Sequence, residues 1–349
     1  MKVILIVTII IAFVALLFLK GAWAMFGTKI TAAKSVKKLT DHLYWMEYIG
    51  DYGFEAYLAQ GGASSEAELA EYITSFLSNG FVKAKSNDVP KDFGCSTLVA
   101  ENTAGGYLMG RNYDWEGRKS KAMIIHTKPE NGYESYSTCG LDFLGFGEEW
   151  KPEGMQNQYM ALAAIYVPLD GMNEKGLCVA DLICGEAMEE THQSGKEANL
   201  TTTSAIRLLL DKAANVDEAI ALLEQYNMNS SVGMAHHLAI ADASGKSVVI
   251  EYVNQEMIVT ETNIVTNHYL SAGEKYGEGN EESHNRFEKL KKMHEEANGK
   301  MTVDKMKNSM KNVSYENITQ WSIIYDLKTC SLDFYWQREF QESYQFLLN

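Results

Sequence analysis

The chain has 349 residues, of which 46% are hydrophobic, so it is long enough to bury a full-sized core. Its formal net charge is −15, which leaves no basic face to neutralise phosphates and argues against nucleic-acid binding. We therefore expect one large globular domain, with or without an accessory segment, that acts on something other than DNA or RNA.

The first 24 residues have the character of a targeting segment. One lysine precedes an unbroken apolar run at residues 3–19, and the small residues Ala22 and Ala24 flank Trp23 as at a signal cleavage site. The run is long for a signal peptide and short for a membrane span, so two interpretations stay open. Residues 1–24 are either a cleaved secretory signal or an N-terminal membrane anchor, and both place the remainder outside the cytoplasm.

Residues 25–94 are predicted to form a small helical pro-segment. Ser65 and Glu68 have the spacing of a capping box at the start of a helix. An apolar stripe with helical spacing follows at Leu69, Tyr72, Ile73, Phe76 and Leu77. A polar linker at residues 83–92 then leads to Gly94.

From residue 95 the apolar pattern changes to period two, which indicates strands. CSTLVAEN and YLMGRNYDW flank the turn sequence TAGG and predict a β-hairpin. Further strands are predicted at residues 121–129, 159–168 and 176–184, the last two apolar enough to be buried on both faces. Helices are predicted at residues 201–214, 215–226, 283–300 and 302–313, and further strands at 236–252, 256–269 and 320–336. This order favours an α+β fold with mostly antiparallel sheets.

The predicted hairpin places chemically useful side chains close together. If a four-residue loop at 103–106 joins its strands, Cys95 lies opposite Asp114, and directly opposed side chains have Cβ atoms ~5 Å apart. Arg111 would point to the other face of a regular strand. A bulge or strand end at residues 112–113 is therefore expected, to bring both Arg111 and Asp114 to Cys95.

A thiolate is a nucleophile, and a nearby Arg111 lowers the pKa of the Cys95 thiol. No histidine lies near in the sequence to act as its base. A cut between Gly94 and Cys95 would supply one, because the new α-amine has a pKa of about 7.7–8.0 and is already on the nucleophile's own residue. Asp114 could then accept a hydrogen bond from this amine, and the small, flexible Gly94 suits a strained scissile bond.

The stretch from Gly94 to Asp114 resembles the choloylglycine hydrolase family of N-terminal-nucleophile hydrolases. The family pattern has an N-terminal Cys with an Arg 16 and an Asp 19 positions later, where Arg111 and Asp114 stand relative to Cys95. Further stretches that resemble the family are DGMNEKGL at 170–177, VTN ending at Asn267, HNRF containing Arg286 and TQWSIIYD at 319–326. The resemblance covers essentially all of residues 95–349.

The resemblance implies a four-layer αββα sandwich of antiparallel sheets at residues 95–349, which hydrolyses linear C–N amide bonds after autocleavage before Cys95. The substrate is a small N-acyl compound of the acyl amino acid, penicillin V or fatty amide type, and neither cofactor nor metal is needed. Cys95 attacks the acyl carbon, Arg111 and Asp114 tune the thiol and the amine, Asn267 donates to the oxyanion, and Arg286 supports the nucleophile electrostatically.

One position departs from the bile salt hydrolases of this family. Ile183 stands where they carry an Asn at the oxyanion hole, so only its backbone N–H could donate there, which lowers the odds of a conjugated bile salt as substrate. Asp181 is interpreted either as a substrate contact or as a buried, hydrogen-bonded carboxylate. The position of Cys95 behind a longer leader resembles the chain organisation of acid ceramidase more than that of the bile salt hydrolases.

Other interpretations remain open at this point. A papain-like hydrolase would pair Cys95 with His236 or His237. These two histidines are adjacent on a predicted strand and point to opposite faces, so they do not easily bind one metal ion. A membrane-tethered binding protein would keep Cys95 unprocessed, and an acyltransferase of the same fold would use an amine in place of water. Asn267 could be a turn residue and Arg286 an exposed one. The oligomeric state, including a homo-oligomer, is also open.

The chain has five cysteines and no C-x-x-C pair. An odd number outside the cytoplasm leaves at least one free thiol, and Cys95 is the candidate. We favour no disulfide at all, with the other four as small buried hydrophobic residues. They are Cys139, Cys178, Cys184 and Cys330.

Overall fold

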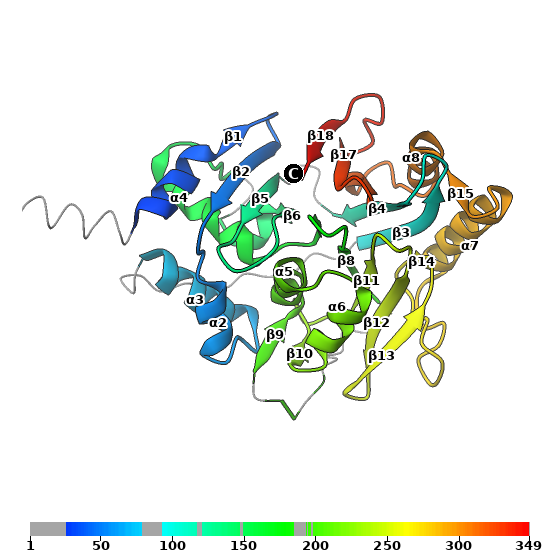
Figure 1. Ribbon diagram of the computed structural model, residues 1–349, viewed down its shortest axis with the longest axis horizontal. Coiled ribbons are helices and arrows are strands. Elements are labelled where there is room, and N and C mark those ends of the chain that lie inside the picture. The colour runs from blue at the N-terminus through cyan, green and yellow to red at the C-terminus, as the bar shows by residue number, and fades with distance from the viewer. Residues whose placement is uncertain are drawn as a thin grey trace, which may run out of the picture.

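The computed structural model describes residues 26–78, 93–116, 121–146, 149–184, 193, 195–196 and 198–348 (Figure 1). The predicted signal or anchor at residues 1–24 and the predicted linker at 83–92 lie outside the described residues. Among the residues that are described, no helix is long and apolar enough to cross a membrane.

Within the described part of the chain, nine strands form one sheet in the order β1-β2-β5-β6-β7-β8-β11-β12-β13. Their bounds are β1 Lys37–Lys38, β2 Leu43–Ile49, β5 Ala122–Lys128, β6 Ser135–Gly140, β7 Asp170–Asn173, β8 Cys178–Ile183, β11 His236–Ala241, β12 Ser247–Val253 and β13 Glu256–Glu261. Only β2 and β5 pair in parallel among these described strands, and the other neighbours are antiparallel.

A second sheet of seven described strands has the order β14-β3-β4-β16-β17-β18, with β15 beside β3. Their bounds are β3 Phe93–Asn102, β4 Tyr107–Trp115, β14 Ile264–Val265, β15 Lys300–Met301, β16 Thr319–Asp326, β17 Ser331–Trp336 and β18 Tyr344–Leu347. A small parallel pair, β9 Asn199–Thr201 and β10 Asn227–Asn229, stands apart from both sheets.

Most of the described helices pack on the outer faces of the two sheets (Figure 1). Residues 26–35 are helical, and the remaining helical elements are α2 Phe54–Ala59, α3 Glu66–Ser78, η1 Leu141–Leu144, α4 Met155–Met160, η2 Ala161–Tyr166, α5 Thr202–Lys212, α6 Val216–Leu223, α7 Glu281–Glu296 and α8 Val303–Asn312. Helices α5 and α6 pack with η2 on the nine-stranded sheet, whereas α7 and α8 pack on the seven-stranded sheet.

Three larger cores of described, buried residues lie between the four layers, beside a small cluster of Cys184, Ala235 and Tyr269. Ile206 of α5 and Ile240 of β11 belong to the core between helices and the nine-stranded sheet. Met172 and Trp321 belong to the core between the two sheets, and Leu290 of α7 to the core beneath the second helical layer. This helix–sheet–sheet–helix order confirms the predicted αββα sandwich.

The predicted hairpin of β3 and β4 is present, but its predicted register is wrong by one residue. Cys95 pairs with Tyr113, and Asp114 pairs with Gly94. The predicted bulge at 112–113 is also absent from this described pair of strands.

The turn explains the register. Five residues, 102–106, join the strands instead of four, because Asn102 side-chain Oδ1 accepts the N–H of Ala104 and the Asn102 N–H donates to the Gly106 carbonyl. Gly105 and Gly106 both have positive φ, at 94° and 85°, which only glycine adopts at low cost.

A bulge does occur beside the site, on the neighbouring strand β16. The register of β16 against β4 shifts between Thr319, which lies opposite Asp114, and Trp321, which lies opposite Tyr113. Gln320 is the extra residue. The bulge therefore re-aims the Thr319 side chain without disturbing the alternation of faces along β4.

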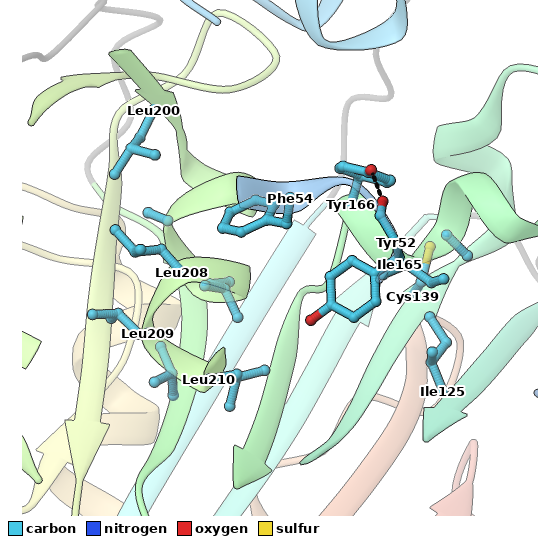
Figure 2. Close-up of a cluster of buried hydrophobic side chains, with 14 of the residues drawn as sticks. Tyr52, Phe54, Ile125, Cys139, Ile165, Tyr166, Leu200, Leu208, Leu209 and Leu210 are labelled. Atoms are coloured by element: carbon cyan, nitrogen blue, oxygen red, sulfur yellow. Dashed lines mark hydrogen bonds between the residues drawn. The ribbon is translucent and has the colours of Figure 1, made fainter. Parts of the chain in front are cut away.

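The prediction of a helical pro-segment is wrong for residues 37–38 and 43–49, which form strands β1 and β2. All seven residues of β2 pair with β5, and Tyr44, Met46 and Tyr48 have no exposed surface. Figure 2 shows Tyr52 and Phe54 of the same segment packed near Tyr166, whose hydroxyl donates to the Tyr52 carbonyl. The segment before Cys95 is thus part of the main core.

Residues 159–168 were predicted to be a buried strand, and this prediction is wrong. The end of α4 and the 3-10 helix η2 occupy this region, and all six residues of η2 are buried. A short apolar run fits a buried helix as well as a buried strand, and three alanines here favour helix.

Truncation of Met46 to alanine in β2 tests the place of this segment in the core. We expect Met46→Ala to lower the free energy of unfolding by about 2–5 kcal/mol, because the lost side chain leaves a cavity. Ile49→Ala at the end of the same strand is the control, since Ile49 is 57% exposed and should change stability by less than about 0.5 kcal/mol. Chemical denaturation measures both, and equal small effects would contradict the assignment.

Candidate active site

Cys95 lies near the start of β3 on the face that points into the core between the sheets. It lines a cavity of about 940 Å³. Its backbone N–H donates to Oδ1 of Asn267 over 2.6 Å. The residue predicted to be the nucleophile therefore stands on a cavity wall with its main chain fixed.

Arg111 shares this inner face and reaches Cys95 diagonally, because it pairs with Thr97. The guanidinium is fully buried. Its Nη2 donates to the carbonyl oxygen of Asp181 over 2.7 Å, and its Nε lies 3.4 Å from Oδ2 of Asp170. The predicted approach of Arg111 to Cys95 is thus reached by a regular strand, without a bulge.

Burial raises the pKa of the Cys95 thiol above its ordinary value. The Arg111 charge opposes this rise, while the charges of Asp114 and Asp181 add to it. Arg111 does lower the pKa of the Cys95 thiol, as expected, but the pKa is raised overall because burial has the larger effect. Burial thus favours the protonated thiol in the intact chain, and attack by Cys95 requires that this proton pass to another group.

Asp170 is a site residue that the sequence interpretation missed. It is fully buried at the start of β7 and accepts hydrogen bonds from Trp321 Nε1 at 2.9 Å and the Tyr325 hydroxyl at 3.1 Å. These bonds aim the carboxylate at Arg111. The available signal was the stretch DGMNEKGL, which begins with Asp170 and to which no role was given.

Asp114 lies on the opposite face of β4 from Arg111, next to Gly94. Its Oδ1 accepts a 2.5 Å hydrogen bond from the Thr319 hydroxyl, and its Oδ2 lies 4.0 Å from Nη1 of Arg286. Burial raises the pKa of Asp114 to about 6, against the opposing effects of Arg286 and Thr319. Asp114 Oδ2 is buried and has no hydrogen-bond partner among the described residues, so it can accept a proton donor on the Gly94–Cys95 side.

A side chain at position 94 would crowd its neighbours, whereas the backbone conformation of Gly94 is unstrained. A Cβ at this position would lie 3.2 Å from Oδ2 of Asp114 and 3.0 Å from a ring carbon of Tyr315. Gly94 lies in the extended strand β3 and has no positive φ. The predicted importance of a small residue before Cys95 thus rests on its close contact with the carboxylate.

Asn267 and Arg286 hold the main chain of Cys95 together. Oδ1 of Asn267 accepts from the Cys95 N–H and from Nη2 of Arg286 at 2.8 Å, while its Nδ2 donates to the Ile183 carbonyl at 2.7 Å. Nη1 of Arg286 donates to the Cys95 carbonyl and, over 2.7 Å, to the Ser96 hydroxyl. Both side chains are buried, which excludes an exposed Arg286, and the Asn267 side chain binds Cys95 and Ile183 of two different strands.

Asp181 and His236 form a buried pair at the cavity wall, with Ile183 nearby. Nδ1 of His236 lies 2.8 Å from Oδ1 of Asp181, and its Nε2 donates to the Ser231 carbonyl at 2.9 Å. Burial lowers the pKa of His236, but the Asp181 charge and hydrogen bond outweigh it and raise the pKa overall. Both ring nitrogens are engaged, so His236 has no lone pair for the thiol proton.

His237 points to the opposite face of β11 and lies 3.0 Å from Glu251, as the alternation predicted. The papain-like arrangement with either histidine is therefore not formed.

All five cysteines are free, and Cys139, Cys178 and Cys184 are buried while Cys330 is half-buried. The prediction of no disulfide is confirmed.

The cavity beside Cys95 has mostly apolar walls. One part comes from Leu69, Ile73 and Leu77 of α3, and another from the segment that includes Phe143 and Met160. Helix α3 precedes the predicted cut. The segment predicted to be a leader thus builds part of the wall of the site.

Comparison with known proteins gives the family. A family model described as acyl-coenzyme A:6-aminopenicillanic acid acyl-transferase matches residues 100–339. The chain belongs to this family. The matched region contains Arg111, Asp114, Asn267 and Arg286 and begins shortly after Cys95.

Individual relatives agree with this assignment. Penicillin V acylase of Pectobacterium atrosepticum is 30% identical over 99 residues, and the match covers 26% of each protein, about a quarter of that relative's length. The crystal structure of a mutant conjugated bile acid hydrolase from Clostridium perfringens superposes with a TM-score of 0.53 at 15% identity, covering 73% of this chain and 92% of that chain. Another variant of that hydrolase gives 0.51 at 16% identity, covering 72% and 92%. The resemblance found in the motifs is confirmed, and these superpositions show the fold.

The raised pKa of Asp114 makes a prediction for stability. The folded chain holds this proton more tightly than the unfolded chain, so the contribution of Asp114 is present below about pH 4 and is lost as pH rises through about 6. Two variants are compared, Cys95→Ala and Cys95→Ala with Asp114→Asn. As the pH rises from about 4 to above 6, the free energy of unfolding should fall by about 3 kcal/mol more in the first variant than in the second. Urea unfolding across this pH range measures the difference, and parallel curves would contradict it.

Proposed function

We propose that the protein is a cysteine amidase that hydrolyses the linear C–N amide bond of N-acyl compounds with an apolar acyl group, after its own chain is cut before Cys95. The observation that carries this proposal is the placement of Cys95, whose side chain meets a large apolar cavity while its N–H and C=O are both held by buried side chains. The family and the names of the relatives, a penicillin V acylase and a conjugated bile acid hydrolase, support the same chemistry.

The cut begins with attack of Cys95 Sγ on the carbonyl carbon of Gly94. The C–N bond breaks, the nitrogen of Cys95 takes up the thiol proton, and a thioester forms. Water then hydrolyses this thioester, which leaves a carboxylate on Gly94 and a free amine and thiol on Cys95. Asp114 lies beside Gly94, and its Oδ2 has no hydrogen-bond partner among the described residues. We propose that the new amine of Cys95 donates a hydrogen bond to this oxygen.

The free α-amine then supplies the base that the intact site lacks. Its ordinary pKa of about 7.7–8.0 leaves a useful fraction neutral near pH 7, and it takes the proton from the thiol of the same residue. The thiolate attacks the acyl carbon of the substrate, the amine product leaves with that proton, and water hydrolyses the thioester. Asn267 stays within hydrogen-bond distance of the amine through Oδ1.

We assign Asn267 and Arg286 supporting roles in this sequence. One hydrogen of Asn267 Nδ2 is bound to the Ile183 carbonyl, and an amide nitrogen has a second hydrogen for an oxyanion. Arg286 holds the carbonyl of Cys95 and brings a buried positive charge to the nucleophile. Asp181 contributes through its carbonyl, which positions Arg111, and its carboxylate is held by His236.

The acyl group is assigned to the apolar cavity. Its volume of about 940 Å³ accommodates a fatty or aryl acyl chain, and Ile183 adds an apolar side chain at the site of reaction. We also keep the proposal that residues 1–24 direct the protein out of the cytoplasm, either as a cleaved signal or as an anchor, because of their apolar run.

An acyltransferase is the second candidate, because the matching family carries that activity in its description. The acyl thioester would then react with an amine, forming a new amide and regenerating the thiol. Addition of free amines to the hydrolysis assay separates the two, since a transferase makes amide product at the expense of free acid.

Cleavage and activity are tested together on the expressed full chain. Intact mass should show a cut before Cys95, and Cys95→Ala should be uncut and without amidase activity, because it lacks the nucleophile of both steps. A panel of N-acyl amides with fatty, aryl and bile acyl groups is the activity assay, and Cys139→Ala is the control that should remain cut and active. An active chain that still spans residues 94 and 95 would contradict this mechanism, and a folded, uncut and inactive chain would point to the binding protein instead.

The two pieces are expected to stay together after the cut. Strand β2 is paired with β5 along its full length and packs into the main core, so its release would expose buried Tyr44, Met46 and Tyr48. Size-exclusion chromatography of the cut protein should give one peak that contains both fragments, and denaturant should separate them. Recovery of an active large fragment alone would show that residues 25–94 are a removable leader.

A further inference from the structure

Tyr113 presents an unpartnered hydroxyl beside the nucleophile. It lines the cavity and is only 4% exposed, and its hydroxyl has no hydrogen-bond partner among the described residues. Buried hydroxyl groups are normally hydrogen-bonded, so an exception at a cavity wall indicates a group that a ligand satisfies.

The position of Tyr113 relative to Cys95 is set by the register of the hairpin. The two residues are direct cross-strand partners on the inner face of β3 and β4. Opposed side chains of such a pair have Cβ atoms about 4.5–5.5 Å apart. A substrate carbonyl within reach of the Cys95 thiol therefore lies next to the Tyr113 side chain.

The ring of Tyr113 is held in place by two neighbours. Trp321 stacks on it with centroids 4.2 Å apart and planes at 21°, and the guanidinium of Arg111 lies 5.4 Å from the ring centroid. Burial raises the pKa of the hydroxyl well above its ordinary value, so it keeps its proton. The Tyr113 hydroxyl is thus a neutral hydrogen-bond donor on a fixed ring, and the ring does not have to move during a reaction.

We propose that the Tyr113 hydroxyl donates a hydrogen bond to the carbonyl oxygen of the scissile amide and to the oxyanion formed from it. This inference rests on the proposed amidase function. When the thiolate adds to the acyl carbon, the carbonyl electron pair moves to oxygen, and the Tyr113 O–H stabilises that charge without giving up its proton. The pair returns when the C–N bond breaks. Ile183, on the same cavity, has no side-chain donor for this task.

The test is Tyr113→Phe, which removes the hydroxyl and keeps the ring between Trp321 and Arg111. Tyr252→Phe is the matched control, because Tyr252 is also buried with a hydroxyl that has no partner among the described residues, but it lies outside the large cavity. Both variants are compared with wild type after the cut, with active sites counted by alkylation of Cys95. Thermal unfolding shows that each is folded.

We expect kcat of Tyr113→Phe to fall by about 10²-fold, with KM within about twofold, because oxyanion donors act in the transition state. The control should keep wild-type values. A wild-type kcat in Tyr113→Phe would overturn the proposal, and so would a loss confined to KM, which would make the hydroxyl a ground-state contact only.

A spectroscopic measurement gives a second readout. The carbonyl stretch of a slowly hydrolysed acyl thioester on Cys95 should lie at lower wavenumber in native wild type than in the denatured acyl-enzyme, and Tyr113→Phe should remove that shift. An unshifted stretch in native wild type would overturn the inference while leaving the thioester, and hence the amidase, in place. A wild-type chain that forms no thioester would instead overturn the proposed function and this inference with it.

Discussion

The main chain of residue 95 is held at both of its polar groups by buried side chains. Asn267 accepts its N–H, Arg286 binds its C=O, and the two are hydrogen-bonded to each other. Asn267 follows β14 and Arg286 belongs to α7, which packs on β3. The helical layer behind the seven-stranded sheet thus fixes the position of the Cys95 thiol. The positions of Arg111, Asp114 and Tyr113 relative to the thiol depend on these hydrogen bonds to the main chain of Cys95.

The alternation of faces along two regular strands then distributes the chemistry. Cys95, Arg111 and Tyr113 face the core between the sheets, where the cavity opens. Gly94 and Asp114 lie on the other face, toward Arg286. The thiol and the carboxylate approach the same peptide unit from opposite sides of one sheet. Burial on both sides raises the pKa of the Cys95 thiol and the pKa of the Asp114 carboxyl above their ordinary values.

Local sequence patterns predicted the elements whose signals are strong. The hairpin of β3 and β4 and the helices α5 to α8 agree with the structure, because period and capping are local properties, whereas the order of the four layers was implied by the family resemblance. The strand β2 was missed because Glu47 is the one charged residue in a mostly apolar run, and the helical signal at residues 65–77 was extended to the whole segment. The strand predicted at 159–168 is helical because a uniformly apolar run does not distinguish the two states.

The sequence by itself determined the motif residues and their order along the chain: Cys95 behind a glycine, Arg111 and Asp114 at fixed offsets, and Asn267 and Arg286 far downstream. The tertiary structure alone decided which atoms meet. A five-residue turn shifted the hairpin by one position, a bulge on β16 aimed Thr319 at Asp114, and Asp170 came to Arg111 from the other sheet. Such contacts depend on side-chain direction and on packing between distant strands, and a one-residue change in register reverses every face, so spacing along the chain does not contain them.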